Sequence, residues 1–432
     1  MIDINLIRTK QTWVKEQLLK RGFKADFAGL LKADEEKRKL LQQVEEMRAE
    51  RNRVTADIAK IKREKRNADS LVSQMQKIGK SIADGEARLS SLDAQVYELM
   101  STFPNIPAED VIAGGKESNK VVKTFGRKPV FGFKPKDHVE LCTKLGLIDY
   151  ERAAKISGAR TWVYTGVGAM LEWALLNYFI DFHISNGYTF ILPPHLLNYE
   201  SGYAAGQFPK FQHEVFCTSI DDGETPGDTK SANFRFLLPT AETALINMHR
   251  GEIIPESKLP IKYAGYSPCY RNADAGYGSK ERGMRRGFQF NKVEMIIFCK
   301  AKDGDKLLAE LIRNAEKLLE GLGLHYQTVA LAAGDCSAAM AKTVDIEVFF
   351  PSANAYQEVS SGSTAHDYQA RRGNIKVKTD AGNEYVHTLN CSGLATSRIV
   401  PAIVEQFQQA DGSVIIPNVL DKYMHGVKVI KQ

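Results

Sequence analysis

The stretch of sequence that decides the fold runs from Pro268 to Glu294 and reads PCYRNADAGYGSKERGMRRGFQFNKVE. Its two ends are typical of β-strands, and the middle, rich in glycine and charge, is typical of a loop. We therefore expect two antiparallel strands, with Arg271 on the first and Phe290 and Glu294 on the second. Strand residues an even number apart point the same way. An arginine suited to phosphate, an aromatic ring suited to a base and a carboxylate suited to an amine then share one surface, which indicates a nucleotide site.

Length and composition fit a soluble protein of two or three domains. The chain has 432 residues, of which 43% are hydrophobic and 25% are charged, and its net charge of +6 is too small to indicate a partner by itself. Six scattered cysteines without CxxC spacing suggest neither a disulfide framework nor a structural zinc site. No signal peptide is visible, and no segment reaches the roughly 20 apolar residues of a membrane span. We expect a cytoplasmic protein with no membrane contact.

Residues 33–100 have the pattern of a helical hairpin. This stretch contains no proline and carries apolar residues at spacings of three, four and seven. The two apolar stripes are Leu40, Val44, Met47, Val54, Ile58 and Ile61, and then Val72, Met75, Ile78, Ile82, Leu89, Leu92, Val96 and Leu99. A polar break at residues 66–70 separates them, with Asn67 suited to ending one helix and Ser70 to capping the next. Two antiparallel arms of about 30 residues follow, each about 45 Å long.

Positive charge is concentrated at the predicted tip of this hairpin. The cluster consists of Lys60, Lys62, Arg63, Lys65 and Arg66, opposed only by Glu64. Such a cluster is either a solvated helix face or a contact for a phosphate backbone carried on a lever. Charge alone favours the solvated face.

The rest of the chain is predicted to form a second domain. Pro104 and Pro107 end the hairpin because proline cannot continue a helix, and a glycine- and lysine-rich connector follows. From residue 135 onward, helices mix with strand-like runs without the regular alternation of a doubly wound sheet. We therefore predict an N-terminal domain over residues 1–105 with an arm at about 33–100, a linker over 106–134, and an α+β catalytic domain over 135–432.

Thr240, Ala241 and Glu242 follow the apolar run Phe236–Pro239 and precede a predicted helix. Threonine followed by glutamate at a helix start is also a capping arrangement, and taken alone this pattern favours capping by roughly two to one.

Five segments together resemble the seryl-tRNA synthetases, a family of class II aminoacyl-tRNA synthetases. The opening stretch resembles their motif 2, and Pro239–Glu242 matches their Pro-Thr-Ala-Glu. Residues 357–361, followed by 369–372, resemble their ATP-binding strand, residues 387–398 resemble motif 3, and residues 188–211 resemble motif 1, the dimer motif. The segments occur in family order behind a helical hairpin, and the resemblance to the bacterial type runs from Met1 to about His425. It implies an antiparallel sheet flanked by helices, preceded by a coiled-coil hairpin.

The resemblance also implies an activity and a set of site residues. The protein would activate L-serine with ATP to seryl-adenylate and transfer it to serine tRNA, or also to selenocysteine tRNA, as a homodimer whose basic hairpin clasps the tRNA. Serine would be bound by Thr240, Ala241, Glu242, Glu294, Asn390 and Ser392. ATP would be bound by Arg271, Asn272, Ala273, Asp274, Arg286, Phe290, Glu358, Val359, Ser360, Ser361 and Arg398. Among these, Arg271, Glu358 and Arg398 would be catalytic, and Glu358 with Ser361 would hold Mg²⁺, which prefers oxygen ligands.

Four departures from the family pattern lie near this site. Ala273 replaces the motif 2 glutamate, although Asp274 supplies a carboxylate if the backbone bulges by one residue. The usual His-Gln-Phe reads Phe288-Gln289-Phe290. The usual Cys-Ser-Asn after the double serine reads Gly362-Ser363-Thr364. Cys391 replaces the glycine of Asn-Gly-Ser, which is expected to put a larger side chain in a tight turn.

Two alternatives to an active serine–tRNA ligase are considered, because fold does not guarantee function. One is a paralogue that keeps the fold but has lost or redirected charging and serves a carrier, biosynthetic or regulatory role. The other is a non-catalytic coiled-coil interaction protein, for which the retained Thr240–Glu242, Glu294 and Arg398 have no explanation.

Overall fold

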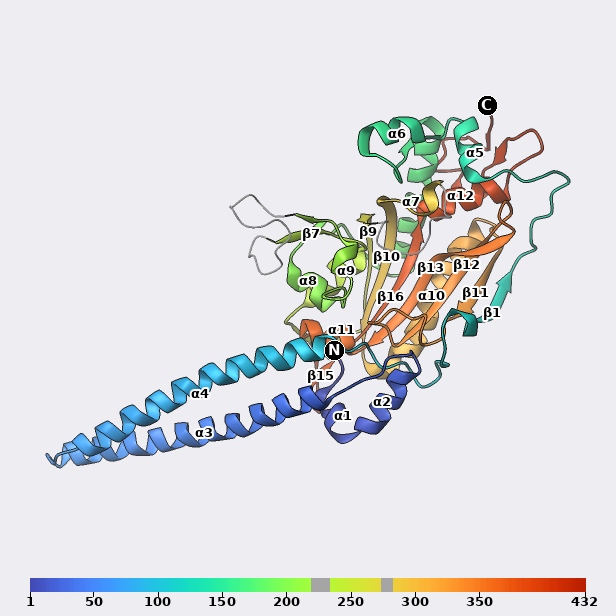
Figure 1. The fold of residues 1–432 in the computed structure, drawn as a ribbon. Helices are drawn as coiled ribbons and strands as arrows, with labels where there is room; N and C mark the ends of the chain where they lie inside the picture. The colour runs from blue at the N-terminus through green and yellow to red at the C-terminus, as the bar shows by residue number, and fades with distance from the viewer. Residues whose placement is uncertain (219–233, 273–282) are drawn as a thin grey trace. The chain divides into compact units, whose positions relative to one another are not determined.

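The computed structural model describes residues 1–218, 234–272 and 283–432, which form two compact units. The first unit comprises Ile2–Glu16 and Lys24–Pro104, and the second comprises Met1, Gln17–Phe23 and Asn105–Gln432. Figure 1 shows a helical hairpin in the first unit and a large sheet in the second.

Two long helices, α3 (Ala28–Arg63) and α4 (Asp69–Ser101), form the predicted antiparallel hairpin, preceded in the chain by α1 (Ile4–Thr9) and α2 (Gln11–Leu19). The predicted stripes face each other, since Val44, Val54, Ile58, Ile82, Leu92 and Val96 are all buried. A Cβ atom on Gly85 would lie 2.6 Å from a methyl group of Val44, so this glycine allows the two helices to pack closely. Arg48 and Glu86 form an ion pair of 2.6 Å between the arms. The hairpin prediction is confirmed, with arms of 36 and 33 residues.

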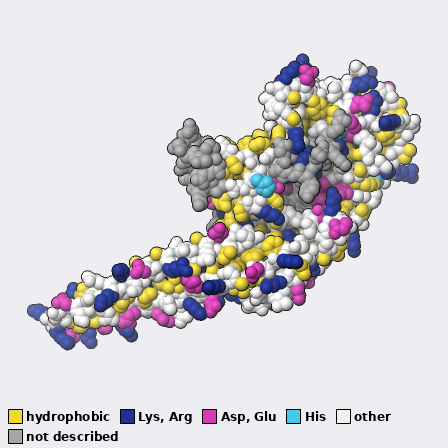
Figure 2. Space-filling model, viewed as in Figure 1, with side chains coloured by type: hydrophobic (Ala, Val, Ile, Leu, Met, Phe, Trp, Pro, Cys, Tyr) yellow, Lys and Arg dark blue, Asp and Glu magenta, His cyan; other side chains and the backbone are white. Residues whose placement is uncertain are grey.

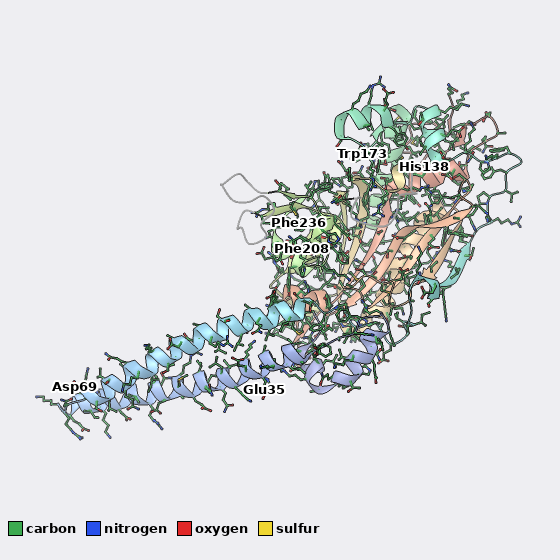
Figure 3. All side chains as sticks on the ribbon, viewed as in Figure 1. Glu35, Asp69, His138, Trp173, Phe208 and Phe236 are labelled. Atoms are coloured by element: carbon green, nitrogen blue, oxygen red, sulfur yellow. The ribbon has the colours of Figure 1, made fainter. Side chains whose placement is uncertain are left out.

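The turn between the arms differs in detail from the expectation. Ser70 lies inside α4 and does not cap it, because the helix already begins at Asp69. The Asn67 side chain accepts a hydrogen bond of 2.7 Å from the Asp69 amide instead. Figures 2 and 3 show basic side chains gathered around this turn, beside Asp69.

The second unit is built on an eight-stranded sheet in the order β1-β11-β12-β13-β16-β10-β9-β4. All neighbours are antiparallel except β4 and β9, which are parallel. The strands are β1 (Lys120–Phe125), β4 (Thr189–Ile191), β9 (Ile261–Tyr270), β10 (Gln289–Cys299), β11 (Tyr326–Ala330), β12 (Lys342–Phe350), β13 (Ala355–His366) and β16 (His387–Ala395). The predicted α+β class is confirmed. Residues 106–134, expected as a linker, contribute the edge strand β1 to this sheet.

Helices cover one face of the sheet. Apolar residues of α7 (Gly166–Ser185), α10 (Gly304–Gly321) and α12 (Thr396–Gln406) form one core with Val293, Met295, Ile297 and Cys299 of β10 (Figure 1). Because strand residues alternate between faces, the even-numbered residues of β10 face the other way. That second face carries the candidate site.

Smaller elements surround the sheet. The remaining helices are α5 (His138–Lys144), α6 (Tyr150–Ser157), α8 (Tyr199–Ala204), α9 (Ala241–Leu245) and α11 (Tyr368–Gly373). Short strands form four further sheets: β2 (Ile148–Asp149) with β3 (Val163–Tyr164); β5 (Leu196–Leu197), β7 (Arg235–Leu237) and β6 (Cys217–Thr218); β15 (Gly382–Tyr385), β14 (Lys376–Thr379) and β8 (Ile253–Pro255); and β17 (Val414–Ile415) with β18 (Val429–Ile430). Phe208 and Phe236, labelled in Figure 3, pack with ring centroids 4.8 Å apart in a local core beside α9. No helix in the described ranges is both long and apolar enough to cross a bilayer.

Candidate active site

Strand β10 supplies the floor of the site. Its residues Phe290, Lys292 and Glu294 alternate onto the face opposite the helical core, and all three line pockets there. The strand pairs with β9 as predicted, with Phe290 opposite Cys269 and Glu294 opposite Gly265. Arg271 lies one residue beyond β9 rather than on it, but its amide donates a hydrogen bond of 3.0 Å to the Phe288 carbonyl. These backbone bonds therefore hold Arg271, predicted to bind phosphate, close to Phe290, predicted to stack on a base.

Two strand irregularities bring other residues onto this face. In β13, Val359 is an extra residue relative to β12, since Ile346 pairs with Ser360 and Glu347 pairs with Glu358. This bulge allows Glu358 and Ser361, three positions apart, to line the same pocket. In β16, the register against β10 shifts between the pair Lys292–Ala395 and the pair Glu294–Ser392. The second bulge places Ser392 directly beside Glu294.

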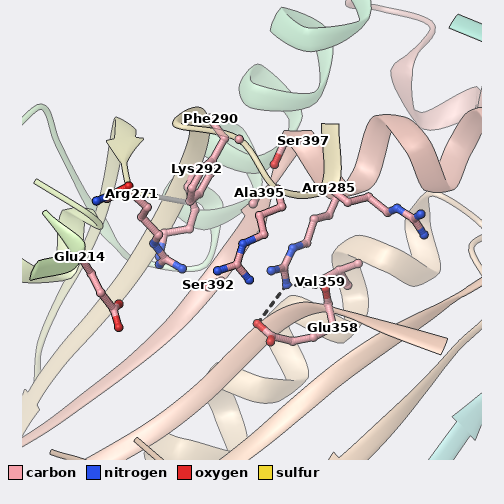
Figure 4. A pocket seen from close by; sticks show the side chains of 14 residues that line it. Glu214, Arg271, Arg285, Phe290, Lys292, Glu358, Val359, Ser392, Ala395 and Ser397 are labelled. Atoms are coloured by element: carbon pink, nitrogen blue, oxygen red, sulfur yellow. Dashed lines mark hydrogen bonds and ion pairs between the residues drawn. The ribbon is translucent and has the colours of Figure 1, made fainter. Parts of the chain in front are cut away.

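The site consists of two adjoining pockets. The first pocket is lined by Phe290, Arg285, Arg286, Val359 and Arg398, among others, and the second by Thr240, Glu242, Glu294, Ser361 and Asn390, among others. Both pockets include Glu214, Arg271, Lys292, Glu358 and Ser392. In Figure 4, Phe290 and Lys292 lie on one side of the first pocket, and Glu358 and Val359 lie on the opposite side. A base-sized aromatic platform and a carboxylate-lined pocket are therefore continuous.

Thr240 is both a helix cap and a site residue. Its hydroxyl accepts a hydrogen bond of 3.3 Å from the Glu242 amide at the start of α9, which confirms the capping interpretation. The same hydroxyl donates to Glu294 at 3.3 Å and accepts from the Lys292 ammonium at 2.7 Å. The cap thus fixes Thr240 among the charged groups of the second pocket.

Two buried carboxylates dominate the second pocket. Glu242 is 8% exposed and Glu294 is 2% exposed. Burial, together with the negative charge of Glu294, raises the pKa of Glu242 to about 7, against the opposing effect of the Gln369 amide, Lys292 and Asn390. The Gln369 amide donates to Glu242 at 2.8 Å, and its oxygen accepts from Thr388 at 2.7 Å. Such a pair of carboxylates is suited to binding a cation.

Arginines occupy the first pocket. The Arg271 Nε donates to the Pro239 carbonyl at 3.1 Å, and its guanidinium carbon lies 5.3 Å from the centroid of the Phe290 ring. Arg398, on the first turn of α12, donates to the Glu358 carbonyl at 2.6 Å and forms an ion pair of 3.2 Å with its carboxylate. This concentration of positive charge beside an aromatic face suits a nucleotide polyphosphate.

Not every predicted residue offers its side chain to these pockets. Val359 lines the first pocket, but it is only 2% exposed and its side chain packs in the helical core, and Ala241 is fully buried. The buried hydroxyl of Ser360 donates to the Ser392 carbonyl at 2.7 Å. Asn272 lines the first pocket, and its amide is bonded to the Glu214 carbonyl at 2.8 Å. Ala273 and Asp274 lie outside the described residues.

Comparison with known proteins places these features in a family. A model of the seryl-tRNA synthetase N-terminal domain matches residues 1–107, and a model of the class II tRNA synthetase core domain (G, H, P, S and T) matches residues 229–407. Serine–tRNA ligase 2 of Clostridium acetobutylicum is 52% identical over 98% of this chain and 99% of its own length. The chain belongs to the seryl-tRNA synthetase family. The serine–tRNA ligase of Thermodesulfovibrio yellowstonii is 42% identical over the full length of both chains. The crystal structure of the Pyrococcus horikoshii seryl-tRNA synthetase complexed with ATP is 32% identical, with a TM-score of 0.89 over 100% of this chain and 99% of that chain.

Two departures from the seryl-tRNA synthetase pattern face each other in the sheet. Cys391 does not lie in a tight turn, as expected, but inside β16, where it pairs with Gly362 of β13. A Cβ atom on Gly362 would lie 3.2 Å from the Cys391 sulfur and 3.0 Å from Ile312. The side chain gained at position 391 therefore fills the space that a side chain at position 362 would need. The two departures therefore lie in direct contact, and Cys391 belongs to the core between the sheet and its helices.

The structure adds three residues that the sequence did not single out for the site. Lys292 is buried between Thr240 and Glu294, and Gln369 holds Glu242. Arg285 lines the first pocket, and its Nε and Nη1 atoms are buried without a hydrogen-bond partner among the described residues. Strand alternation through Phe290 and Glu294 would have identified Lys292, whereas the other two depend on tertiary contacts.

Oxygen atoms near Glu358 and Ser361 fit a hard cation. Asp345 pairs with Ser361 across β12 and β13, and its Oδ1 atom is buried without a hydrogen-bond partner in the part of the chain that the structure describes. Burial and the charge of Glu358 raise the pKa of Asp345. No three His, Cys, Asp or Glu side chains among the described residues are grouped to hold a metal by themselves. This donor set matches Mg²⁺ that shares its ligands with substrate phosphates.

Proposed function

We propose that this protein is a serine–tRNA ligase, which activates L-serine with ATP to seryl-adenylate and transfers it to serine tRNA. The single observation that carries the proposal is the joined pair of pockets along β10, with the Phe290 platform at one end and the Thr240, Glu242 and Glu294 cluster at the other. Family membership over the full chain supports the same reaction.

In this proposal the second pocket binds serine. Glu242 and Glu294, together with the Thr240 hydroxyl, bind the substrate ammonium, and the helix cap holds Thr240 in place. Asn390 and Ser392, on the same pocket wall, bind the hydroxyl. A site built to hydrogen-bond a hydroxyl rejects an analogue without it, because its own polar groups would be left unpaired.

The first pocket binds ATP in this proposal. Adenine stacks on Phe290, the α-phosphate meets Arg271, and the terminal phosphates meet Arg398 and Arg286. Arg285, whose buried guanidinium nitrogens lack partners among the described residues, adds a further phosphate contact. Attack of the serine carboxylate on the α-phosphate forms the adenylate bond and releases pyrophosphate. Such chemistry needs positioning and charge neutralisation rather than covalent help from the protein.

Glu358 and Ser361 would hold Mg²⁺ in this proposal, with Asp345 beside them. When bound, the ion neutralises phosphate charge and orients the leaving pyrophosphate. The Glu358 side chain is 46% exposed while Arg398 pairs with its carboxylate. Asp345 and Glu358 both line a further pocket with Arg285 and Arg398.

The N-terminal hairpin binds tRNA in this proposal, within a domain over residues 1–105, and residues 135–432 form the catalytic domain. The five basic residues at the tip are all exposed, and Arg66 forms an ion pair of 3.2 Å with its neighbour Glu64. Such a cluster of positive charge is suited to binding the phosphate backbone of an RNA duplex.

We further propose a homodimer that works in the cytoplasm. Trp173 of α7 is 55% exposed, and Leu192 and Leu196, which follow β4, are 70% and 54% exposed. These apolar side chains within and near the motif 1 segment fit a covered interface. The six cysteines are all unpaired, as suits a reducing compartment.

The test is charging of serine tRNA with labelled serine, with ATP–pyrophosphate exchange measured in parallel. We expect both reactions to depend on serine. Exchange without charging would instead indicate the paralogue with redirected activity. The absence of exchange with every amino acid would refute the proposed function.

A further inference from the structure

Lys292 occupies the place of the substrate ammonium. Its Nζ lies 2.7 Å from the Thr240 hydroxyl and forms an ion pair with the Glu294 carboxylate, and the residue is only 6% exposed. Thr240 and Glu294 are the groups that bind the ammonium of serine in the proposed function. An ammonium supplied by the protein is therefore already bonded to them.

The hydrogen-bonding capacity of Thr240 is fully used in this arrangement. A hydroxyl has one hydrogen to donate and two lone pairs to accept with. The hydrogen goes to Glu294, and the lone pairs accept from Lys292 and from the Glu242 amide. A second ammonium can bond to Thr240 only if Lys292 leaves, because the amide bond belongs to the helix cap.

Lys292 has somewhere to go when it leaves. It lies between Phe290 and Glu294 on one face of β10 and lines both pockets. Its four-carbon side chain is flexible and ends in a compact charge. The carboxylate of a bound amino acid must face the α-phosphate in the first pocket, which is the direction in which Lys292 can turn.

We propose that Lys292 is an exchangeable counter-ion: it neutralises Glu294 in the empty site, and it transfers to the substrate carboxylate when the ammonium of serine takes its place. The inference rests on the proposed function. It gives the site a way to keep the buried Glu294 carboxylate paired both before and after binding, since a buried charge without a partner is costly. It also makes binding depend on both charges of the amino acid, because an amine alone displaces Lys292 without giving it a new partner.

The test compares L-serine with ethanolamine, which has the same hydroxyl and ammonium but no carboxylate. Binding is measured by calorimetry for the unaltered protein and for Lys292→Met. In the variant, ethanolamine supplies the missing ammonium to Glu294, so its affinity is expected to rise about tenfold, while that of L-serine falls about tenfold. Lys262→Met is the matched control, because Lys262 pairs with Glu310 at 2.6 Å on the neighbouring strand β9 and lines neither pocket. The control is expected to bind both ligands like the unaltered protein.

Ethanolamine affinity that stays unchanged or falls in Lys292→Met would overturn the proposal. A structure of the unaltered protein with bound L-serine is an independent test that needs no variant. Exchange requires Lys292 Nζ to have moved beyond hydrogen-bonding distance of Thr240 Oγ1, and retention of the 2.7 Å contact would also overturn it. The counter-ion role of Lys292 and the proposed function can fail separately. If either result above rejects the counter-ion role, the unaltered protein can still catalyse serine-dependent pyrophosphate exchange, which tests the proposed function.

Discussion

Exchanging the residues at positions 362 and 391 is expected to be far less harmful than either single change. In the sheet, Gly362 and Cys391 are direct partners, and Cys391 is fully buried. A Cβ atom added at position 362 would lie 3.0 Å from Ile312 and 3.2 Å from the Cys391 sulfur, before any further atom is placed. Gly362→Cys therefore overpacks the sheet and is expected to lower the free energy of unfolding by about 1–3 kcal/mol.

Cys391→Gly has the opposite defect. It leaves a cavity where the buried side chain was and adds backbone freedom in a strand, which together cost about 2 kcal/mol. In the double variant the new side chain at 362 fills the space vacated at 391. The two changes should therefore couple by about 3 kcal/mol, so that the double variant lies within about 1 kcal/mol of the unaltered protein.

The assay is urea unfolding of all four proteins, followed by tryptophan fluorescence, with serine-dependent exchange measured in parallel. Two of the three tryptophans, Trp162 and Trp173, lie in the sheet-containing unit, so the signal includes its unfolding; Trp13 lies in the other unit. Destabilisation of the double variant equal to the sum of the single changes would show that the two positions do not compensate each other.

Three further predictions concern the site and the arm. The raised pKa of Glu242 means that this carboxyl is protonated below about pH 7, so the KM for serine should rise about tenfold for each pH unit below that value. Glu242→Gln should abolish this pH dependence, and a KM for serine that does not change with pH in the unaltered protein would contradict the prediction. Arg285→Leu should raise the KM for ATP about tenfold in exchange assays and leave the KM for serine unchanged, because it removes one charge-assisted phosphate contact; an unchanged KM for ATP would exclude that role. Lys62→Glu with Arg63→Glu should lower kcat/KM for tRNA charging at least about tenfold without affecting exchange, and an equal loss in both assays would point to misfolding instead.

Much of the architecture follows from local patterns. The helical hairpin is predictable because its stripes keep helical spacing over many turns and nothing else can bury them. Strands β9 and β10 are predictable from their alternation, and the same alternation places Phe290, Lys292 and Glu294 on one face.

The remaining features depend on register, which a single sequence does not show. Simple alternation puts Glu358 and Ser361 on opposite faces of β13, and only the bulge at Val359 brings them together. In the same way, the contact of Cys391 with Gly362 arises from the pairing of two strands distant in sequence, so the glycine of the family pattern wrongly suggested a turn at position 391. Arg285 and Gln369 become part of the site only through tertiary packing.

Selection of serine by its hydroxyl is tested by the ratio of kcat/KM for serine to that for alanine in ATP–pyrophosphate exchange. Asn390 and Ser392, which bind the substrate hydroxyl in the proposed function, line the same pocket as Glu242 and Glu294. We expect a ratio of about 10⁴ or more, because alanine leaves the polar groups of Asn390 and Ser392 unpaired. A ratio near one, or no exchange with serine, would contradict this expectation.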